Sequence, residues 1–204
     1  MTSVAVLDYG VGNLFSMSNA LKRAGLNVNV TGDPQEIGSA DAIVLPGVGN
    51  FGPASTNLQP FAEPIRRALE EDVPMLGSCL GMQLLFERSE ESPEEGLGLL
   101  KGRVRRFQGE MKVPHMGWNT IKAARESPLL EGIPDGEYFY FVHSYYPEPA
   151  DGDATLALTD YEGDFTSVVE SGPLYGTQFH PEKSGKAGAM LLSNFAGIVR
   201  GRKR

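Results

Sequence analysis

The sequence predicts an α/β protein with a mostly parallel central sheet flanked by helices, to which the second half adds antiparallel strands. Two observations lead to this fold class. Apolar strand-like segments alternate with amphipathic helical segments through residues 1–90, as in parallel sheets that helices cover on both faces. Later strand-like segments are separated by Gly, Pro and Asp turns, which is typical of antiparallel pairing.

The elements of the first half follow from hydrophobic spacing. Continuous or alternating apolar residues predict strands, whereas apolar residues three and four positions apart predict helices. The predicted strands are residues 3–8, 26–30, 41–47 and 73–78. The predicted helices are residues 13–24, 54–70 and 80–87. Gly25 ends the first helix, because glycine is favoured directly after a helix C-terminus.

The second half is expected to extend the same sheet. Its predicted strands are residues 102–107, 137–146, 155–161, 166–171 and 174–180. Residues 186–199 then predict a closing helix, and the Glu-rich segment 87–98 is expected to be a solvated loop. Because the chain contains no repeat, low-complexity segment or linker, we expect residues 1–204 to form one domain.

The composition excludes several classes of function. A formal net charge of −8 is opposite in sign to the basic surface that nucleic-acid binding requires. No apolar run approaches the roughly 20 residues of a membrane span, and the N-terminus lacks the basic region of a signal peptide. The single cysteine cannot form an internal disulfide, so we expect a cytoplasmic protein. One cysteine and three scattered histidines lack the spacing of a zinc site, and no metal is expected.

The only cysteine, Cys79, lies within Gly77-Ser78-Cys79-Leu80-Gly81. In hydrolases the pattern Gly-x-nucleophile-x-Gly marks a sharp strand-to-helix turn, where small neighbours permit a strained backbone at the nucleophile. The turn would lift the thiol above the sheet edge, and the N-terminus of the next helix would favour the thiolate. The backbone N–H of Leu80 is then a candidate oxyanion donor. A buried structural cysteine is the alternative until a base is found.

A thiol nucleophile needs a base, and His180 is the best candidate among the three histidines. Glu182 follows two residues later, and residues i and i+2 of an extended segment point the same way. Pro181 favours an extended backbone at His180. His180 would therefore act as base and Glu182 would orient it. His115 and His143 have no such neighbour, and their spacing favours structural roles.

Two glycine-rich loops, residues 8–13 and 45–52, follow predicted strands. The first lacks the third glycine of a dinucleotide fingerprint, and the second lacks the Lys-Ser/Thr of a P-loop, so no cofactor is expected. The second loop would lie at the same sheet edge as Cys79 if the strands are parallel neighbours. The backbone N–H of Val48 or Gly49 is therefore a candidate second oxyanion donor.

Several motifs, in order along nearly the whole chain, resemble known enzymes. Class I glutamine amidotransferases carry motifs similar to PGVGNFG (46–52), GSCLGMQLLFE (77–87) and GTQFHPEKSG (176–185). Within that family, the glutaminase subunits of imidazole glycerol phosphate synthases, which act in histidine biosynthesis, carry motifs similar to three further segments. These are LDYGVGNL (7–14), VPHMGWN (113–119) and YFVHSYY (140–146). Ser78 departs from the family, which usually has an aliphatic residue there.

The resemblance implies a reaction. Cys79 would attack the side-chain amide of glutamine, with His180 as base and Glu182 orienting it. A glutamyl thioester would form as ammonia leaves, and water would then release glutamate. The resemblance also implies a set of substrate-binding residues, namely Gly47, Gln83, Ser144 and Tyr145.

The resemblance further implies a partner that consumes the ammonia. The length leaves no room for a second catalytic domain, so we expect a heterodimer with a (β/α)8-barrel cyclase. The cyclase would turn a phosphorylated ribulosyl-formimino nucleotide into imidazole glycerol phosphate and an aminoimidazole carboxamide ribotide. The implied interface residues are Asn13, Trp118, Tyr140 and Lys183. For Trp118, core filling is the alternative to an interface anchor.

Three other functions compete with this interpretation. A class I glutaminase of pyridoxal phosphate or nucleotide synthesis would not be expected to carry VPHMGWN. A deglycase-like hydrolase with a cysteine elbow would not usually carry His-x-Glu after a C-terminal strand. A degenerate domain that only binds or regulates a partner would be expected to lack one of Cys79, His180 and Glu182, and all three are present.

Overall fold

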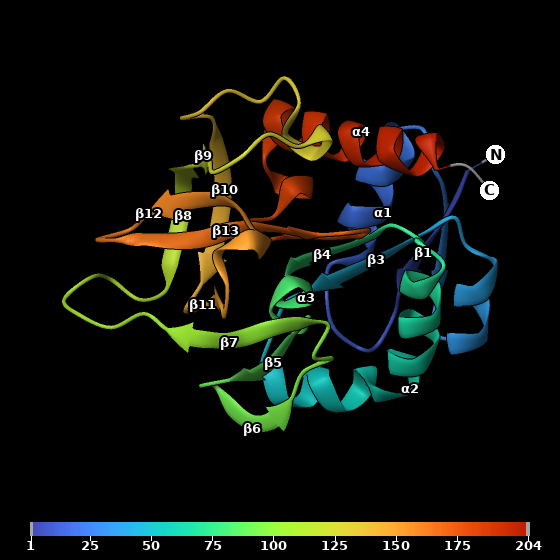
Figure 1. Ribbon diagram of the computed structural model, residues 1–204, viewed down its shortest axis with the longest axis horizontal. Coiled ribbons are helices and arrows are strands. Elements are labelled where there is room, and N and C mark those ends of the chain that lie inside the picture. The colour runs from blue at the N-terminus through green and yellow to red at the C-terminus, as the bar shows by residue number, and fades with distance from the viewer. Residues whose placement is uncertain (1, 203–204) are drawn as a thin grey trace.

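The computed structural model describes residues 2–202, so Met1, Lys203 and Arg204 of the expected single domain lie outside it. The main sheet has eight strands in the order β2-β1-β3-β4-β14-β13-β12-β9 (Figure 1). They are β1 (Ser3–Leu7), β2 (Asn27–Thr31), β3 (Ala42–Gly47), β4 (Met75–Cys79), β9 (Lys122–Ala123), β12 (Thr155–Asp160), β13 (Asp164–Ser171) and β14 (Leu174–Thr177). The first five strands in that order, from β2 through β14, pair in parallel. Strands β13, β12 and β9 each pair antiparallel with the strand that precedes them in the sheet order. The predicted fold class is confirmed.

Helices cover both faces of the parallel part of the sheet (Figure 1). Helices α1 (Leu14–Arg23) and α4 (Gly185–Gly201) lie on one face, and α2 (Phe51–Glu70) lies on the other. Strand β1 shows why the run is continuously apolar: Val4 and Val6 enter one core cluster and Leu7 enters the other. Successive side chains of a strand point to opposite faces, so a strand between two helical layers needs apolar residues at every position.

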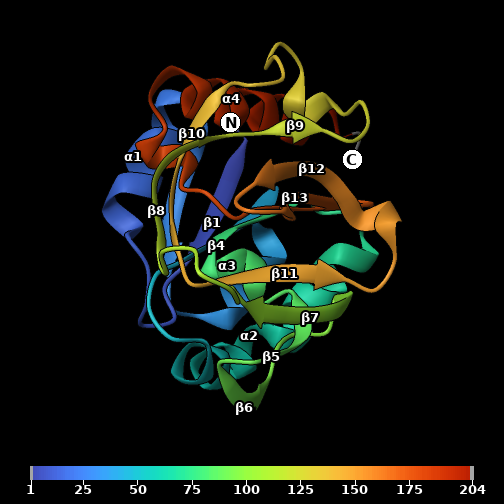
Figure 2. The same cartoon turned by 90° about the vertical axis from the view of Figure 1, so that its left-hand side faces the viewer.

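Two smaller sheets differ from the prediction that all later strands extend the main sheet. Strand β10 (Tyr138–His143) pairs with β8 (His115–Thr120) in a two-stranded ribbon. A four-stranded sheet contains β11 (Tyr145–Pro149), β7 (Leu100–Arg106), β5 (Phe86–Ser89) and β6 (Ser92–Glu95). Figure 2 shows the β8–β10 ribbon to the left of the short helix α3 (Leu80–Gln83) and the four-stranded sheet below it. They surround the edge of the main sheet where β4 ends.

The predicted helix 80–87 was wrong beyond its first turn, because α3 ends at Gln83. Leu84, Leu85 and Phe86 are consecutive and fully buried, whereas a surface helix buries only one stripe. The Glu-rich segment was also wrongly predicted as a loop, since it contains β5 and β6. Its charged side chains are mostly exposed, so the predicted exposure to solvent is confirmed, whereas the prediction of a segment without strands is wrong.

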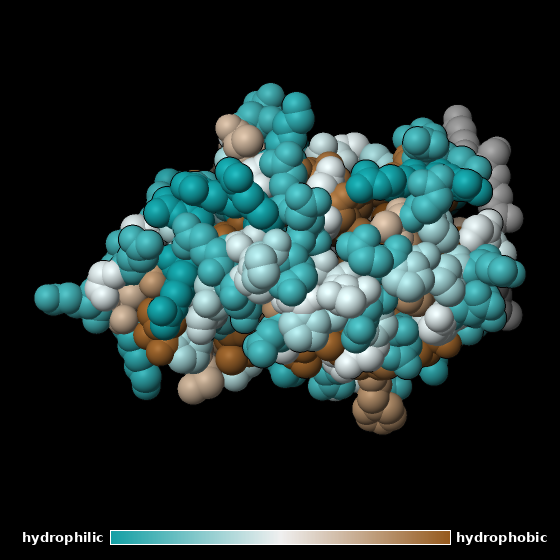
Figure 3. All heavy atoms as spheres, turned by 90° about the horizontal axis from the view of Figure 1, so that it is seen from below, coloured by the Kyte–Doolittle hydropathy of each residue, from teal (hydrophilic) through white to brown (hydrophobic). Residues whose placement is uncertain are grey.

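The surface is largely polar. Figure 3, a view from below Figure 1, shows hydrophilic side chains over most of that face, with separate hydrophobic groups between them. Within residues 2–202, no helix is long and apolar enough to cross a membrane. Three of the exposed large hydrophobic side chains, Met116, Trp118 and Tyr138, lie on the ribbon formed by β8 and β10.

Helix α4 provides a matched test of close packing, because one of its glycines lies against Pro181 and another faces open space. A Cβ on Gly188 would lie 1.9 Å from the Pro181 carbonyl oxygen, whereas a Cβ on Gly197 of the same helix would meet no atom within 4 Å. Gly188→Ala should therefore lower the free energy of unfolding by about 1–3 kcal/mol through overpacking. Gly197→Ala should raise it by up to about 1 kcal/mol, because alanine favours the helix.

Urea unfolding of both variants measures the two changes in the free energy of unfolding. The m-value, which is the slope of that free energy against urea concentration, should stay unchanged. Equal stability of the two variants would contradict the packing of α4 on the segment that follows His180.

Candidate active site

Three neighbouring parallel strands bring the predicted site to one edge of the main sheet. In the order β3-β4-β14, Gly47 pairs in register with Cys79, and Thr177 pairs with Ser78. His180 follows three residues after Thr177. The carboxyl ends of parallel strands share one edge, so the loop, the thiol and the imidazole meet there.

Cys79 forms the predicted strained turn, with φ 53° and ψ −110°. A positive φ is costly for a residue with a Cβ and persists only where the surrounding structure enforces it. A Cβ on Gly77 would lie 2.7 Å from the Gly81 carbonyl oxygen, and a Cβ on Gly81 would lie 1.8 Å from that of Leu45. The backbone at this turn is therefore too closely packed for any residue but glycine on either side.

The short α3 changes what the helix contributes to the site. A helix of one turn has a weaker dipole than the predicted one, so it stabilises a thiolate less than expected. Its first N–H groups still have no acceptor within the helix, and Leu80 lines the cavity at the thiol. Ser78, the departure from the family, is buried and donates to the Phe179 carbonyl at 3.5 Å. The extra hydroxyl therefore finds an acceptor on the segment that carries His180.

His180 and Glu182 form a buried pair. The His180 Nδ1 lies 2.9 Å from the Glu182 Oε1, so Nδ1 carries the hydrogen and Nε2 is the nitrogen free to act on substrate. The backbone is extended at His180, as predicted, but residues Pro181–Lys183 form the 3-10 turn η4 instead of continuing the extension. The turn, not an extended segment, returns the carboxylate to the ring.

The electrostatics of His180 favour a charged ring. Burial alone lowers the pKa of His180, but the Cys79 sulfur and the Glu182 carboxylate outweigh burial and raise it to about 9. Among the described residues, the buried Nε2 makes no hydrogen bond of normal geometry, although the thiol is near enough to affect its charge. The raised pKa therefore favours the imidazolium form of the ring, the form that can protonate a leaving group.

A chain of side-chain amides, which the sequence did not reveal, connects the thiol to the wall of the cavity. The Gln178 Nε2 donates to the Cys79 sulfur at 3.7 Å, and the Gln178 Oε1 accepts from the Gln83 Nε2 at 3.2 Å. The Gln83 Nε2 also donates to the Tyr145 carbonyl at 2.8 Å. Nucleophile and wall are thereby held in one network.

A cavity of about 340 Å³ opens at the thiol, a size suited to a small metabolite. The predicted residues that line it are Val48, Gly49, Cys79, Leu80, Gln83, Ser144 and Tyr145. Gly47 does not line it. A Cβ on Gly47 would meet the Gly81 nitrogen at 2.6 Å and the Tyr9 hydroxyl at 3.0 Å, so Gly47 lets the loop approach α3 closely.

Glu91 lines the same cavity and was missed by the sequence analysis. Its Oε2 accepts from the backbone N–H of Phe51 at 3.0 Å, at the start of α2. Among the described lining residues it is the one acidic side chain. Glu91 lies in the Glu-rich segment, where no local pattern distinguishes it from its solvated neighbours.

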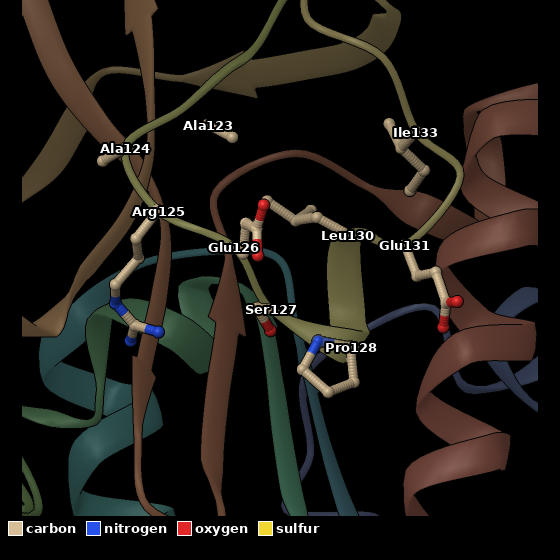
Figure 4. A pocket seen from close by; sticks show the side chains of 9 residues that line it. All are labelled: Ala123, Ala124, Arg125, Glu126, Ser127, Pro128, Leu130, Glu131 and Ile133. Carbon is tan, nitrogen blue, oxygen red and sulfur yellow. The ribbon is translucent and has the colours of Figure 1, made fainter.

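A larger cavity of about 700 Å³ lies elsewhere, along residues 123–133 between the main sheet and α4. Figure 4 shows its side chains spread along one loop, with Arg125 directed away from Glu131. Arg125 forms an ion pair with Glu170 at 2.9 Å, and the lining contains neither cysteine nor histidine. The smaller cavity is therefore the candidate active site.

The structure also positions the predicted interface residues. Trp118 is 56% exposed, which excludes core filling, and its ring meets the Tyr140 ring edge-on across the ribbon at 6.0 Å. The Asn13 side chain caps α1 by accepting from the Ser16 N–H at 3.1 Å, and Lys183 is exposed on η4. Trp118 and Tyr140 thus lie together, whereas Asn13 also has a structural role.

His115 and His143 lie in the interior and are hydrogen-bonded to each other at 2.9 Å. Within residues 2–202, no three His, Cys, Asp or Glu side chains are grouped so that they could bind a metal ion.

Comparisons with known proteins agree with the geometry. The family model described as glutamine amidotransferase class-I matches residues 5–198. The imidazole glycerol phosphate synthase subunit HisH of Geobacillus thermodenitrificans is 49% identical, with 100% of this chain and 99% of the relative covered. The subunit of the same name from Methanothermobacter thermautotrophicus is 50% identical, with 97% of this chain and 99% of the relative covered.

Solved structures share the fold at low sequence identity. PurLQS from Thermotoga maritima has a TM-score of 0.79 at 20% identity, with 97% of this chain and 98% of that chain covered. The glutaminase domain of CTPS from Trypanosoma brucei has a TM-score of 0.71 at 17% identity, with 100% and 96% covered. The chain therefore belongs to the class I glutamine amidotransferase family and, within it, to the family of HisH subunits of imidazole glycerol phosphate synthase.

Proposed function

We propose that this chain is the glutaminase subunit of an imidazole glycerol phosphate synthase and supplies ammonia to a cyclase partner. The observation that carries the proposal is the strained Cys79 turn beside the buried His180–Glu182 pair, at a cavity of suitable size. About half of the residues are identical to those of HisH subunits, which supports a role in histidine biosynthesis over one in pyridoxal phosphate or nucleotide synthesis. We place the reaction in one domain, residues 1–204, in the cytoplasm.

The chemistry follows from the charge state of the pair. The Cys79 thiolate attacks the amide carbon of the glutamine side chain and forms a tetrahedral oxyanion. The N–H of Leu80, together with that of Val48 or Gly49, stabilises this oxygen. The His180 imidazolium gives its proton to the departing nitrogen, so ammonia leaves and a glutamyl thioester remains. His180, now neutral, takes a proton from water, which attacks the thioester and releases glutamate.

The cavity wall suits the amino-acid end of glutamine. Glu91 provides a carboxylate for the α-ammonium group, and Gln83 and Ser144 provide further polar groups in the lining. Glu91 lies between β5 and β6 and Ser144 lies between β10 and β11, whereas Gln83 is on α3, directly after the thiol. Gly47 supports the loop without touching substrate.

The ribbon formed by β8 and β10 is the proposed docking face for a (β/α)8-barrel cyclase in a heterodimer. Met116, Trp118 and Tyr138 are each more than half exposed, although large apolar side chains are normally buried. The same ribbon is bonded to the base, because the His180 N–H donates to the Tyr140 carbonyl at 3.0 Å. Docking at this ribbon is thus linked to the triad through this backbone hydrogen bond and through Ser184, whose hydroxyl accepts from the Tyr140 N–H and donates to the His180 carbonyl.

Cys79→Ala should abolish glutamine-dependent synthesis of imidazole glycerol phosphate and leave ammonia-dependent synthesis by the partner intact, because only the glutaminase step needs the thiol. The two rates are measured with the purified complex, with Ser78→Ala as the matched neighbouring control. Retained use of glutamine by the Cys79→Ala complex would disprove the nucleophile assignment.

The rate should depend on pH through His180. The imidazolium proton is present below a pKa of about 9 and is lost above it, so kcat/KM for glutamine should fall as the pH rises through about 9. Glu182→Gln removes a carboxylate that raises this pKa, so the alkaline limb should move to lower pH and the rate should drop. An alkaline limb that stays in place in Glu182→Gln would argue against their coupling.

Trp118→Ala should weaken association with the cyclase by about 2 kcal/mol or more, roughly thirtyfold in Kd, if Trp118 anchors the interface. Met190→Ala removes another exposed apolar side chain, on α4 away from the ribbon, and serves as the control. Calorimetric titration gives both affinities. Equal affinities for the two variants would place the docking face elsewhere.

A further inference from the structure

Two buried histidines have no part in the reaction proposed above. His115 on β8 and His143 on β10 face each other in register, with the His115 Nδ1 2.9 Å from the His143 Nε2. His143 also lines the glutamine cavity, and its Nδ1 lies 2.9 Å from the Tyr145 carbonyl oxygen. The pair therefore links the outer strand of the ribbon to the wall of the cavity.

The hydrogen bonds determine the tautomer of each ring. A backbone carbonyl only accepts, so the His143 Nδ1 must carry a hydrogen. In the neutral ring the His143 Nε2 then accepts, and the His115 Nδ1 must donate to it. By the same logic the His115 Nε2 accepts from the Asn119 Nδ2, which lies 3.2 Å away. Both rings are neutral with the hydrogen on Nδ1.

Asn119 fixes the outer end of this chain, because its amide cannot turn over. The Asn119 Nδ2 also donates to the Asp160 carbonyl at 2.9 Å, and its Oδ1 accepts from the Thr120 N–H at 2.8 Å. Every polar atom of the amide thus has a partner of the required kind. Asn119 follows the exposed Trp118 directly, so this end lies on the ribbon strand that carries the proposed docking face.

The inner end of the chain reaches the substrate residue Gln83. The Tyr145 carbonyl accepts from His143 at 2.9 Å and from the Gln83 Nε2 at 2.8 Å, which occupies both of its lone pairs. The second Nε2 hydrogen of Gln83 is donated to Gln178. Both N–H groups are used, so the group that Gln83 can offer to the cavity is its carbonyl oxygen.

The surroundings keep both rings uncharged. The His143 ring lies among Phe107, Phe141 and Phe165, with centroids 5.3–5.7 Å away. Burial lowers the pKa of His143 to about 3, against the effect of the hydrogen bond to Tyr145, and the neighbouring His115 and His180 lower it further. Burial likewise lowers the pKa of His115 to about 4.

We propose that His143, held by His115 in its Nδ1–H tautomer, is a positioning residue for glutamine. It holds the Tyr145 carbonyl in place, and the carbonyl orients Gln83 so that the Gln83 oxygen faces the α-ammonium group of the substrate. This inference rests on the proposed glutaminase function. His143 does not touch the reacting atoms and acts only through Tyr145 and Gln83.

The test compares two variants at the same position in the complex with the cyclase. His143→Leu removes the donor to Tyr145, whereas His143→Asn retains an amide N–H near the position of Nδ1. The KM for glutamine should rise by roughly tenfold or more in His143→Leu, with a smaller change in kcat, since binding and not the chemical step is impaired. His143→Asn should recover most of the loss. An unchanged KM in His143→Leu, or equal KM values for both variants, would overturn the proposal.

Because the chain has one cysteine, alkylation reports on the thiol separately from binding. Iodoacetamide should modify Cys79 at a similar rate in wild type and His143→Leu, whereas a chloromethyl ketone analogue of glutamine should react more slowly with His143→Leu. Equal slowing of both reagents would indicate general damage to the site and contradict a positioning role. Failure of wild type to hydrolyse glutamine would refute the proposed function instead.

Nitrogen NMR of the imidazole rings tests the tautomers in wild type, independently of whether any variant folds. Both His115 and His143 should be neutral and protonated on Nδ1 at neutral pH. In His115→Leu, the KM for glutamine should rise in the same direction as in His143→Leu, and His115→Asn should reverse it. A charged ring, or hydrogen on Nε2 of His143, would overturn the proposal.

Discussion

The close approach of three strands at the Cys79 turn is the constraint on which the remaining site depends. Cys79 keeps a left-handed backbone because β4 turns into α3 directly against β3, where Gly81 contacts the Leu45 carbonyl. The same parallel register places the Gly47 loop on one side of the thiol and His180 on the other. Any side chain at Gly77 or Gly81 would force this turn apart, and the thiol, the Gly47 loop and the His180 ring would no longer meet.

In the proposed function, chemistry and recognition come from different parts of the fold. The main sheet supplies the thiol and the His180–Glu182 pair, whereas the two smaller sheets and their connections supply Glu91, Ser144 and the exposed ribbon. The backbone bond between His180 and Tyr140 and the amide chain through Gln178 join the two parts. A displacement of the ribbon would therefore reach both the His180 ring and the cavity wall.

The parts that the sequence predicted well are those with local patterns. The Cys79 turn follows from flanking glycines, the His180–Glu182 pair from a two-residue spacing, and the main sheet from apolar periodicity. The two smaller sheets, Glu91 and the Gln178 contact depend on residues far apart in the chain, for example 99 positions between Gln178 and Cys79. The single-turn α3 shows the same limit, because burial by distant strands overrides a helical pattern.

A glutamyl thioester on Cys79 is the species that distinguishes this glutaminase chemistry from direct attack by water on the amide. The complex, supplied with glutamine and quenched in acid, is digested and examined by mass spectrometry. The peptide that contains Cys79 should carry the mass of one glutamyl group, and the modification should disappear after treatment with a competing thiol. Turnover of glutamine with no such adduct, or with the adduct on another residue, would contradict covalent catalysis by Cys79.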